Sequence, residues 1–141
     1  MATEVVNRQR RRRVATQMWA TLATEMLTAI GRENGSATIA FVSDARIREL
    51  NRSFRGIDKA TDVLSFPDSA DGTQAGSQNL GDIAVSVETA EAQAAKNGLT
   101  FDQEISQLIL HGLLHLCGYD HETDNGEMNR LEVRLRRKLG I

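Results

Sequence analysis

The stretch from Thr100 to Leu116 constrains the fold most, because its pattern is helical and it is apolar on nearly every side. Thr100 and Gln103 have the spacing of a capping box, which predicts that a helix begins here. A helix that is apolar all round has to be buried. We therefore expect this helix to lie at the centre of the domain. Its apolar residues are Ile105, Leu108, Ile109, Leu110, Leu113, Leu114 and Leu116.

All three histidines of the chain lie at the end of this helix or just beyond it, at His111, His115 and His121. The first two are four residues apart, which places both imidazoles on one face of a helix. Gly118 can end the helix and turn the chain so that His121 comes back towards the other two. Three converging imidazoles form a zinc site with a fourth position left for water. The spacing therefore predicts one zinc ion per chain.

The spacing H-x-x-x-H-x-x-G-x-x-H is also that of the long zinc-protease signature, with one change. Gly112 stands where those enzymes carry the glutamate that acts as general base. The metal cage is present and the protease base is missing, which argues for different chemistry at the same kind of site. Cys117 lies about 200° around the helix from His115, so we expect it to face the core rather than the metal.

The rest of the chain alternates strand patterns with helical patterns, which predicts a small, partly parallel sheet with helices packed on it. The expected strands are 4–7, 38–42, 62–66 and 81–85, and the other expected helices are 14–30, 44–54, 87–97 and 124–139. The expected buried stripe of the first helix is Met18, Leu22, Met26 and Ile30, broadened by Trp19 and Leu27, and that of the second is Ile47, Leu50 and Phe54. At this length we expect residues 1–141 to form a single domain.

The charge of the chain is nearly balanced, with a formal net charge of −2. This argues against a protein coated in positive charge for non-specific nucleic-acid binding, but it leaves room for local basic patches. The patch at Arg134 and 136–138 suits the C-terminus of a helix. The run 8–13 would oppose the dipole of the helix that follows it, so a phosphate backbone is its natural ligand.

One cysteine excludes an internal disulfide and fits a reducing compartment. No apolar run is long enough for a membrane span or a secretory signal. We therefore expect a cytoplasmic protein with no membrane contact.

Three motifs occur together between residues 50 and 121. They are Leu50–Gly56 followed by Thr61–Pro67, then Leu80–Ile83, and then His111–His121. This combination resembles the YbeY family of bacterial endoribonucleases and ribosomal RNA maturation factors. The resemblance implies an α/β (α+β) fold with a four-stranded mixed sheet, about five helices and a central buried metal-binding helix. It also implies zinc on His111, His115 and His121.

The same resemblance implies a zinc-dependent, single-strand-specific endoribonuclease that acts in 3′-end maturation of small-subunit ribosomal RNA and in ribosome quality control. It implies an essential arginine at the position of Arg55. The partners that it implies are ribosomal RNA, a protein of the small ribosomal subunit and a ribosome-assembly GTPase.

The chemistry of the residues is compatible with phosphodiester cleavage. Zinc lowers the pKa of a bound water to about 7. The guanidinium of Arg55 offers a planar fork of donors to charge that grows on phosphoryl oxygens. Asp120 could orient a histidine or relay a proton. The candidate catalytic residues are therefore Arg55, His111 and Asp120.

Two other functions stay open from the residues alone. One is a zinc hydrolase of peptides or other substrates, with its base at Glu122 or Asp120. The other is a non-catalytic ribosome-assembly factor in which the metal only stabilises the fold and the basic patches dock it.

Overall fold

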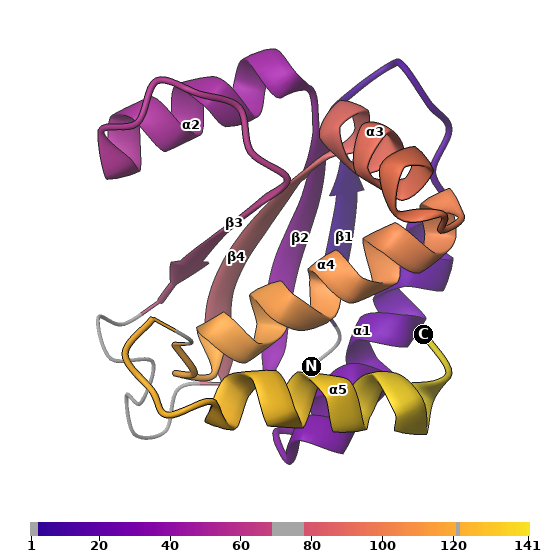
Figure 1. The fold of residues 1–141 in the computed structure, drawn as a ribbon, viewed down its shortest axis with the longest axis vertical. Helices are drawn as coiled ribbons and strands as arrows, with labels where there is room; N and C mark the ends of the chain where they lie inside the picture. The colour runs from indigo at the N-terminus through magenta and orange to yellow at the C-terminus, as the bar shows by residue number, and fades with distance from the viewer. Residues whose placement is uncertain (1–2, 69–77, 121) are drawn as a thin grey trace.

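The computed structural model describes residues 3–68, 78–120 and 122–141, and it shows one mixed sheet with helices on both faces (Figure 1). The strands are β1 (Glu4–Asn7), β2 (Ser36–Val42), β3 (Val63–Pro67) and β4 (Asn79–Ser86). The helices are α1 (Thr16–Ile30), α2 (Asp44–Arg55), α3 (Val87–Asn97), α4 (Phe101–Leu116) and α5 (Glu127–Leu139). The strand order is β1-β2-β4-β3, with β3 antiparallel to β4 and the other neighbours parallel. The predicted α+β fold is confirmed.

Helix α4 is the centre of the molecule, as its sequence predicts. It crosses one face of the sheet and contacts β3, β4, α1, α3 and α5 (Figure 1). The capping box is present, since the Thr100 hydroxyl accepts from the Gln103 backbone N–H at 3.1 Å and the Gln103 side chain accepts from the Thr100 N–H at 2.9 Å. Ile109 and Leu113 are fully buried. A rigid, buried helix is a suitable support for the histidines at its end.

Gly112 allows α4 to lie close to strand β4. A Cβ atom at this position would be 3.0 Å from Cδ1 and 3.2 Å from Cγ2 of Ile83. The position at which zinc proteases carry their glutamate therefore faces the sheet in this protein, and it has no room for a long side chain.

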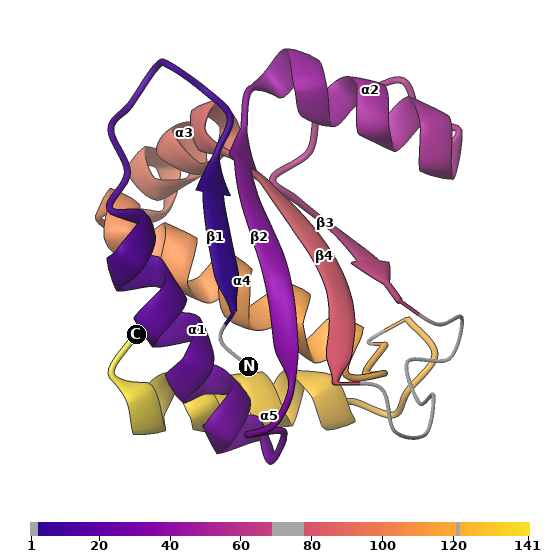
Figure 2. The ribbon, with the colours of Figure 1, turned by 180° about the vertical axis from the view of Figure 1, so that it is seen from behind.

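The opposite face of the sheet carries a second, smaller core beneath α2 (Figure 2). Successive strand residues point to opposite faces, so Ile83 and Val85 belong to the main core and Ala84 to the smaller one. The smaller core consists of Val42, Ile47, Leu64 and Ala84, with Ala40, Leu50, Ala60 and Phe66 packed against it. The prediction that Phe54 completes the buried stripe of α2 is wrong, because its side chain is 68% exposed.

The predicted stripe of α1 is correct at Trp19, Met26 and Leu27 and wrong at Met18. Met18 is 45% exposed, whereas the next residue, Trp19, is 2% exposed and lies 6.4 Å from the ring of Phe41. Burying the large indole rotates the helix, so that Ala23 and Met26 complete the inward face. In the ranges that the structure describes, no helix is long and apolar enough to cross a membrane.

Candidate active site

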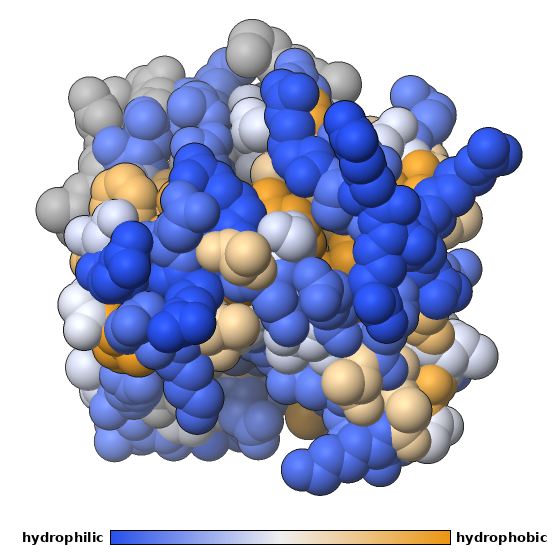
Figure 3. Space-filling view, turned by 90° about the horizontal axis from the view of Figure 1, so that it is seen from above, coloured by the Kyte–Doolittle hydropathy of each residue, from blue (hydrophilic) through white to orange (hydrophobic). Residues whose placement is uncertain are grey.

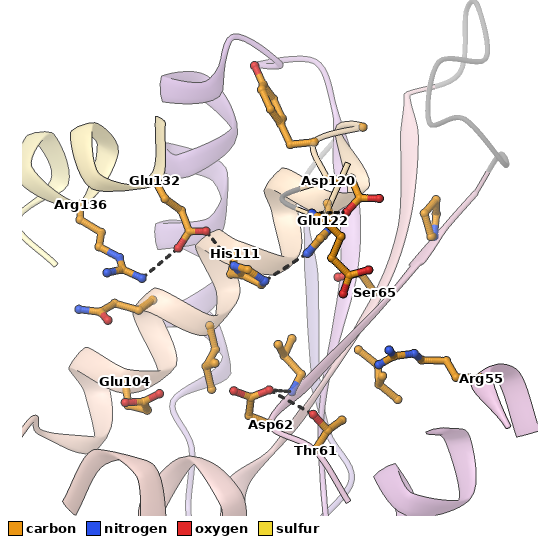
Figure 4. Close-up of a pocket in the computed structure, with 18 of the residues that line it drawn as sticks. Arg55, Thr61, Asp62, Ser65, Glu104, His111, Asp120, Glu122, Glu132 and Arg136 are labelled. Carbon is orange, nitrogen blue, oxygen red and sulfur yellow. Dashed lines mark hydrogen bonds and ion pairs between the residues drawn. The ribbon is translucent and has the colours of Figure 1, made fainter. Parts of the chain in front are cut away.

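A cleft of about 900 Å³ lies between α4, β3 and the turn that follows α4. It brings together five residues that the sequence singled out: Arg55, His111, His115, Asp120 and Glu122. Figure 4 shows Arg55 reaching towards the cleft from α2, across from His111 on α4. His121, the predicted third zinc ligand, lies outside the described residues.

His111 and His115 aim their Nε2 atoms at each other. These atoms are 3.1 Å apart, and the ring centroids are 4.7 Å apart with the planes at 78°. Two nitrogens that are each 2.0–2.1 Å from one zinc ion have to lie within about 4 Å of each other, so the pair fits a shared metal. Without a metal, the same distance suits a hydrogen bond in which one Nε2–H donates to the other nitrogen.

The described ranges, which omit residue 121, contain no group of three or more His, Cys, Asp or Glu side chains that could hold a metal ion. The imidazole pair is therefore the part of the predicted zinc site that these ranges contain. Zinc itself, and His121 as its third ligand, stay predictions.

Glu132 on α5 contacts His111 at Nδ1, the ring nitrogen that does not face His115. Its Oε1 is 2.7 Å from His111 Nδ1, and its Oε2 accepts from Arg136 at 2.9 Å. A proton on Nδ1, donated to this carboxylate, leaves the lone pair of Nε2 facing His115, which is the tautomer that a metal ligand needs. Figure 4 shows the chain of contacts from Arg136 through Glu132 to His111.

The charge of Glu132 is maintained although the side chain is buried. Burial raises the pKa of this carboxyl, but the hydrogen bond and charge of His111 and the guanidinium of Arg136 outweigh burial, so the pKa lies below its ordinary value. The role of Glu132 was not predicted from the sequence. A signal was available, because Glu132 lies four residues after Met128 and three before Leu135, on the buried face of α5.

Arg55 is the last residue of α2, and Gly56 ends the helix in the left-handed conformation at φ 70°. The side chain is exposed, and it forms no ion pair with any residue in the described ranges. A cation that lines a cleft without a carboxylate partner is available to a negatively charged ligand.

Asp120 shapes the turn after α4. Its Oδ1 accepts from the Glu122 N–H at 3.0 Å, and its carbonyl oxygen accepts from the Thr123 N–H at 3.2 Å. The side chain also lines the cleft. Its structural role is thus evident, and its role in proton transfer stays a prediction.

Cys117 packs against the main core and is not among the residues that line the cleft. Burial raises the pKa of its thiol, although the charge of Arg32 acts in the opposite direction. A thiol has to lose its proton to bind zinc, and this one is held protonated. The predicted direction of Cys117, towards the core, is confirmed.

The basic run 8–13 is partly neutralised by the protein itself. Arg11 and Arg12 form ion pairs with Glu91 at 3.2 and 3.7 Å, and the guanidinium of Arg12 lies 3.8 Å from the ring centroid of Phe101. These contacts tie the loop to α3 and α4. Contact of this run with RNA stays a prediction, and it rests on the other arginines of the loop, which are also exposed.

Comparison with known proteins decides the family. The family model described as Endoribonuclease YbeY matches residues 4–140. The chain belongs to the YbeY family. A relative from Solibacter usitatus, named Endoribonuclease YbeY, is 55% identical over 70% of this chain and 62% of its own length. One of the same name from Anaeromyxobacter is 40% identical over 100% of this chain and 73% of its own length.

A Thermotoga maritima protein whose solution structure is known has a similar fold. The TM-score is 0.67 at 26% sequence identity, covering 97% of this chain and 88% of the other. Some relatives are longer than this chain, which matches less than two thirds of the length of the Solibacter protein.

Replacing Glu132 with glutamine is expected to weaken zinc binding. The amide keeps the shape of the carboxylate but removes its charge, so the imidazole becomes a poorer ligand. Removal of a group that hydrogen-bonds to a metal ligand typically lowers metal affinity by about 10- to 100-fold. The measurement is a competition titration of the metal-free protein with zinc and a chromogenic chelator.

Two further variants are the controls for Glu132→Gln, one expected to lose the metal and one expected to keep it. His111→Ala should lose most of the metal, and Cys117→Ser should retain it. Zinc affinity in Glu132→Gln equal to that of the wild type would mean that Glu132 supports only the packing of α5 against α4.

Proposed function

We propose that this chain is a zinc-dependent endoribonuclease that cleaves single-stranded RNA. The observation that carries the proposal is the pair of imidazole nitrogens 3.1 Å apart in a cleft that Arg55 also lines. Membership of a family named for endoribonuclease activity supports the same conclusion.

In this proposal, His111, His115 and His121 hold one zinc ion. When bound, zinc supplies a water of lowered pKa and a Lewis-acid contact for a phosphoryl oxygen. Glu132 keeps His111 in the correct tautomer and orientation. Arg55 donates hydrogen bonds to the phosphoryl oxygens as their charge grows in the transition state. Asp120, beside the metal ligands, is the candidate for proton transfer to the leaving oxygen.

The packing of Gly112 argues against a zinc peptidase. A peptidase of this signature needs a glutamate at that position as its base. Here the position is buried against Ile83 rather than directed at the cleft.

We propose further that the substrate is the 3′ end of small-subunit ribosomal RNA, and that the protein acts in the cytoplasm. Its proposed partners are a protein of the small ribosomal subunit and a ribosome-assembly GTPase. These finer statements follow from the family resemblance of the three motifs.

The experiment is cleavage of a labelled single-stranded RNA by the purified protein, run beside casein as a peptide substrate. Activity on RNA should be lost after chelation and restored by zinc, and casein should stay intact. Cleavage of casein without cleavage of RNA would favour the peptidase alternative. If neither is cleaved and metal-loaded protein still corrects a ribosome-assembly defect, the non-catalytic assembly factor is the better explanation.

A further inference from the structure

Phe54 is the most exposed large hydrophobic side chain in the described ranges, at 68%. It lies in the last turn of α2, and Ile57, which follows that helix, is 41% exposed. Ile47 and Leu50 of the same helix pack on the smaller core, so Phe54 is not needed to bury the helix. Neighbouring exposed apolar residues of this kind often belong to an interaction surface.

The ring of Phe54 is held in place by a second aromatic ring. Phe66 on β3 lies edge-to-face with it, with centroids 5.1 Å apart and planes at 62°. Phe66 in turn packs against the smaller core. The two rings therefore form a fixed aromatic surface, to which we refer as the Phe54–Phe66 platform.

Hydrogen bonds also hold the turn that follows Phe54. Arg48 donates two hydrogen bonds to the Asp58 carboxylate, at 2.7 and 3.2 Å. The Asn51 amide donates to the Lys59 carbonyl at 2.9 Å. Both contacts tie the turn after α2 back onto the helix. A ligand that stacks on the platform would therefore meet a surface that is already ordered.

The charges around the platform select the kind of ligand. Arg46 and Arg48 are paired with Glu49 and Asp58. Arg52 and Arg55 form no ion pair with any of the described residues, and both are exposed. The charge of Arg52 nevertheless acts on Asp58, whose pKa is lowered chiefly by its hydrogen bond with Arg48 and also by Arg52. An aromatic face that adjoins the unpaired guanidinium of Arg55 along the chain suits a nucleotide, because the base stacks and the phosphate meets the cation. Figure 3 shows the upper face of the molecule, where hydrophilic side chains surround small apolar patches.

The residues of the platform are chain neighbours of residues that line the cleft, and strand β3, at the edge of the sheet, separates the two. Arg55, which follows Phe54, lines the cleft, and so do Ser65 and Pro67, which flank Phe66. Because side chains alternate along β3, Phe66 points to the other face of that strand. An RNA strand that leaves the cleft over the edge of the sheet would meet the platform.

The charges that line the cleft bear on this path, because carboxylates line it beside the histidines, at Asp120 and Glu122, and also farther along α4. Asp62 and Glu104 line the cleft near the start of α4, and Glu104 is only 6% exposed. Their carboxylates repel phosphates. Arg55 on the α2 side attracts them.

We propose that the Phe54–Phe66 platform is a stacking site for one unpaired base of single-stranded RNA, adjacent to the phosphate that is cleaved. This inference rests on the proposed endoribonuclease function and adds a substrate-binding subsite to it. The site favours any unpaired base, because every base has a stacking face.

The test is single-turnover cleavage of a single-stranded RNA over a range of enzyme concentrations with the zinc-loaded protein. Phe54→Ala should raise the half-saturating concentration on the order of 5- to 150-fold, the loss expected for one stacked base. The rate at saturation should stay close to that of the wild type. Phe54→Tyr should keep most of the binding. Val133→Ala is the matched control, since Val133 is 43% exposed on α5 and does not line the cleft.

A second arm uses RNAs that each lack one base near the cleavage site. One such RNA should bind the wild-type protein more weakly, and that penalty should be absent with Phe54→Ala, as expected for two changes that remove one contact. The stacking site would be overturned if Phe54→Ala had the half-saturating concentration of the wild type, or if Phe54→Tyr and Phe54→Ala lost binding equally. Cleavage of RNA by the wild-type protein would still uphold the proposed function. In that case a protein partner is the better occupant of the platform. A wild-type protein that neither binds nor cleaves RNA would overturn both.

Discussion

Replacing Gly112 with glutamate, which would restore the zinc-protease signature, is expected to unfold the protein rather than create a protease. The new Cβ would lie 3.0–3.3 Å from three side-chain atoms of Ile83, in a part of α4 that is fully packed against β4. Overpacking alone typically costs about 1–3 kcal/mol. The carboxylate would add a buried charge without a partner, which costs several kcal/mol more. Since domains are stable by about 5–15 kcal/mol, this change should remove most of that stability.

The measurement is urea unfolding followed by circular dichroism, with Gly112→Ala as the matched control. Alanine adds only the Cβ, and the neighbour that it meets is a side chain that can shift. Alanine also gains about 1 kcal/mol in helix propensity over glycine. Gly112→Ala should therefore unfold at a urea concentration close to that of the wild type. A cooperatively folded Gly112→Glu with an unchanged midpoint would show that α4 does not pack against the sheet at this position.

The features that the sequence predicted correctly are local ones. Helix caps depend on residues three positions apart, and both hydrogen bonds of the predicted capping box between Thr100 and Gln103 are present. The same holds for the imidazole pair, because a spacing of four residues on a helix fixes which side chains meet. The central position of α4 was predictable for a different reason, since a helix apolar on all sides has only one stable location.

The errors arise where the sequence leaves two choices of face. In α1, the predicted stripe contains both Met18 and Trp19, which point about 100° apart on the helix, and only the side of Trp19 is buried. Ala23 lies on the face that is buried, but an alanine gives only a weak signal of burial. In α2, Phe54 continues the periodicity of Ile47 and Leu50, yet the smaller core ends before it. Periodicity gives the direction of a side chain and not how far the core extends.

The rest of the site depends on contacts between distant segments. Glu132 is 21 residues from His111, and nothing in the local pattern of α5 states which group its carboxylate meets. Arg55 lines the cleft because α2 packs against β3. That contact is set by the tertiary fold and not by the local sequence. Arg11 and Arg12 look like free cations in the sequence, but Glu91, about 80 residues away, neutralises part of their charge. A charge run in a sequence is therefore an upper limit on the charge that a ligand meets.

Removal of the Arg55 side chain is expected to slow cleavage far more than it weakens RNA binding. If the guanidinium stabilises charge that grows in the transition state, its loss affects the chemical step. Removing one such donor typically costs about 10²–10³ in rate. The measurement is the single-turnover rate of Arg55→Ala at saturating RNA, after the zinc content has been checked. Arg55→Lys should recover only part of the rate, because lysine keeps the charge but not the fork of donors.

Arg52→Ala is the matched control. Arg52 is an exposed arginine one turn earlier in α2, and it is not among the residues that line the cleft. If it contacts phosphates in the ground state only, its loss should weaken binding and reduce the dependence of binding on salt. A variant with Arg10 to Arg13 changed to glutamine should behave in the same way, to the extent that the arginines not held by Glu91 touch RNA. If Arg55→Ala reached the wild-type rate once saturated, Arg55 would belong with these docking residues, and the charge that grows during cleavage would have to be stabilised by the metal site alone.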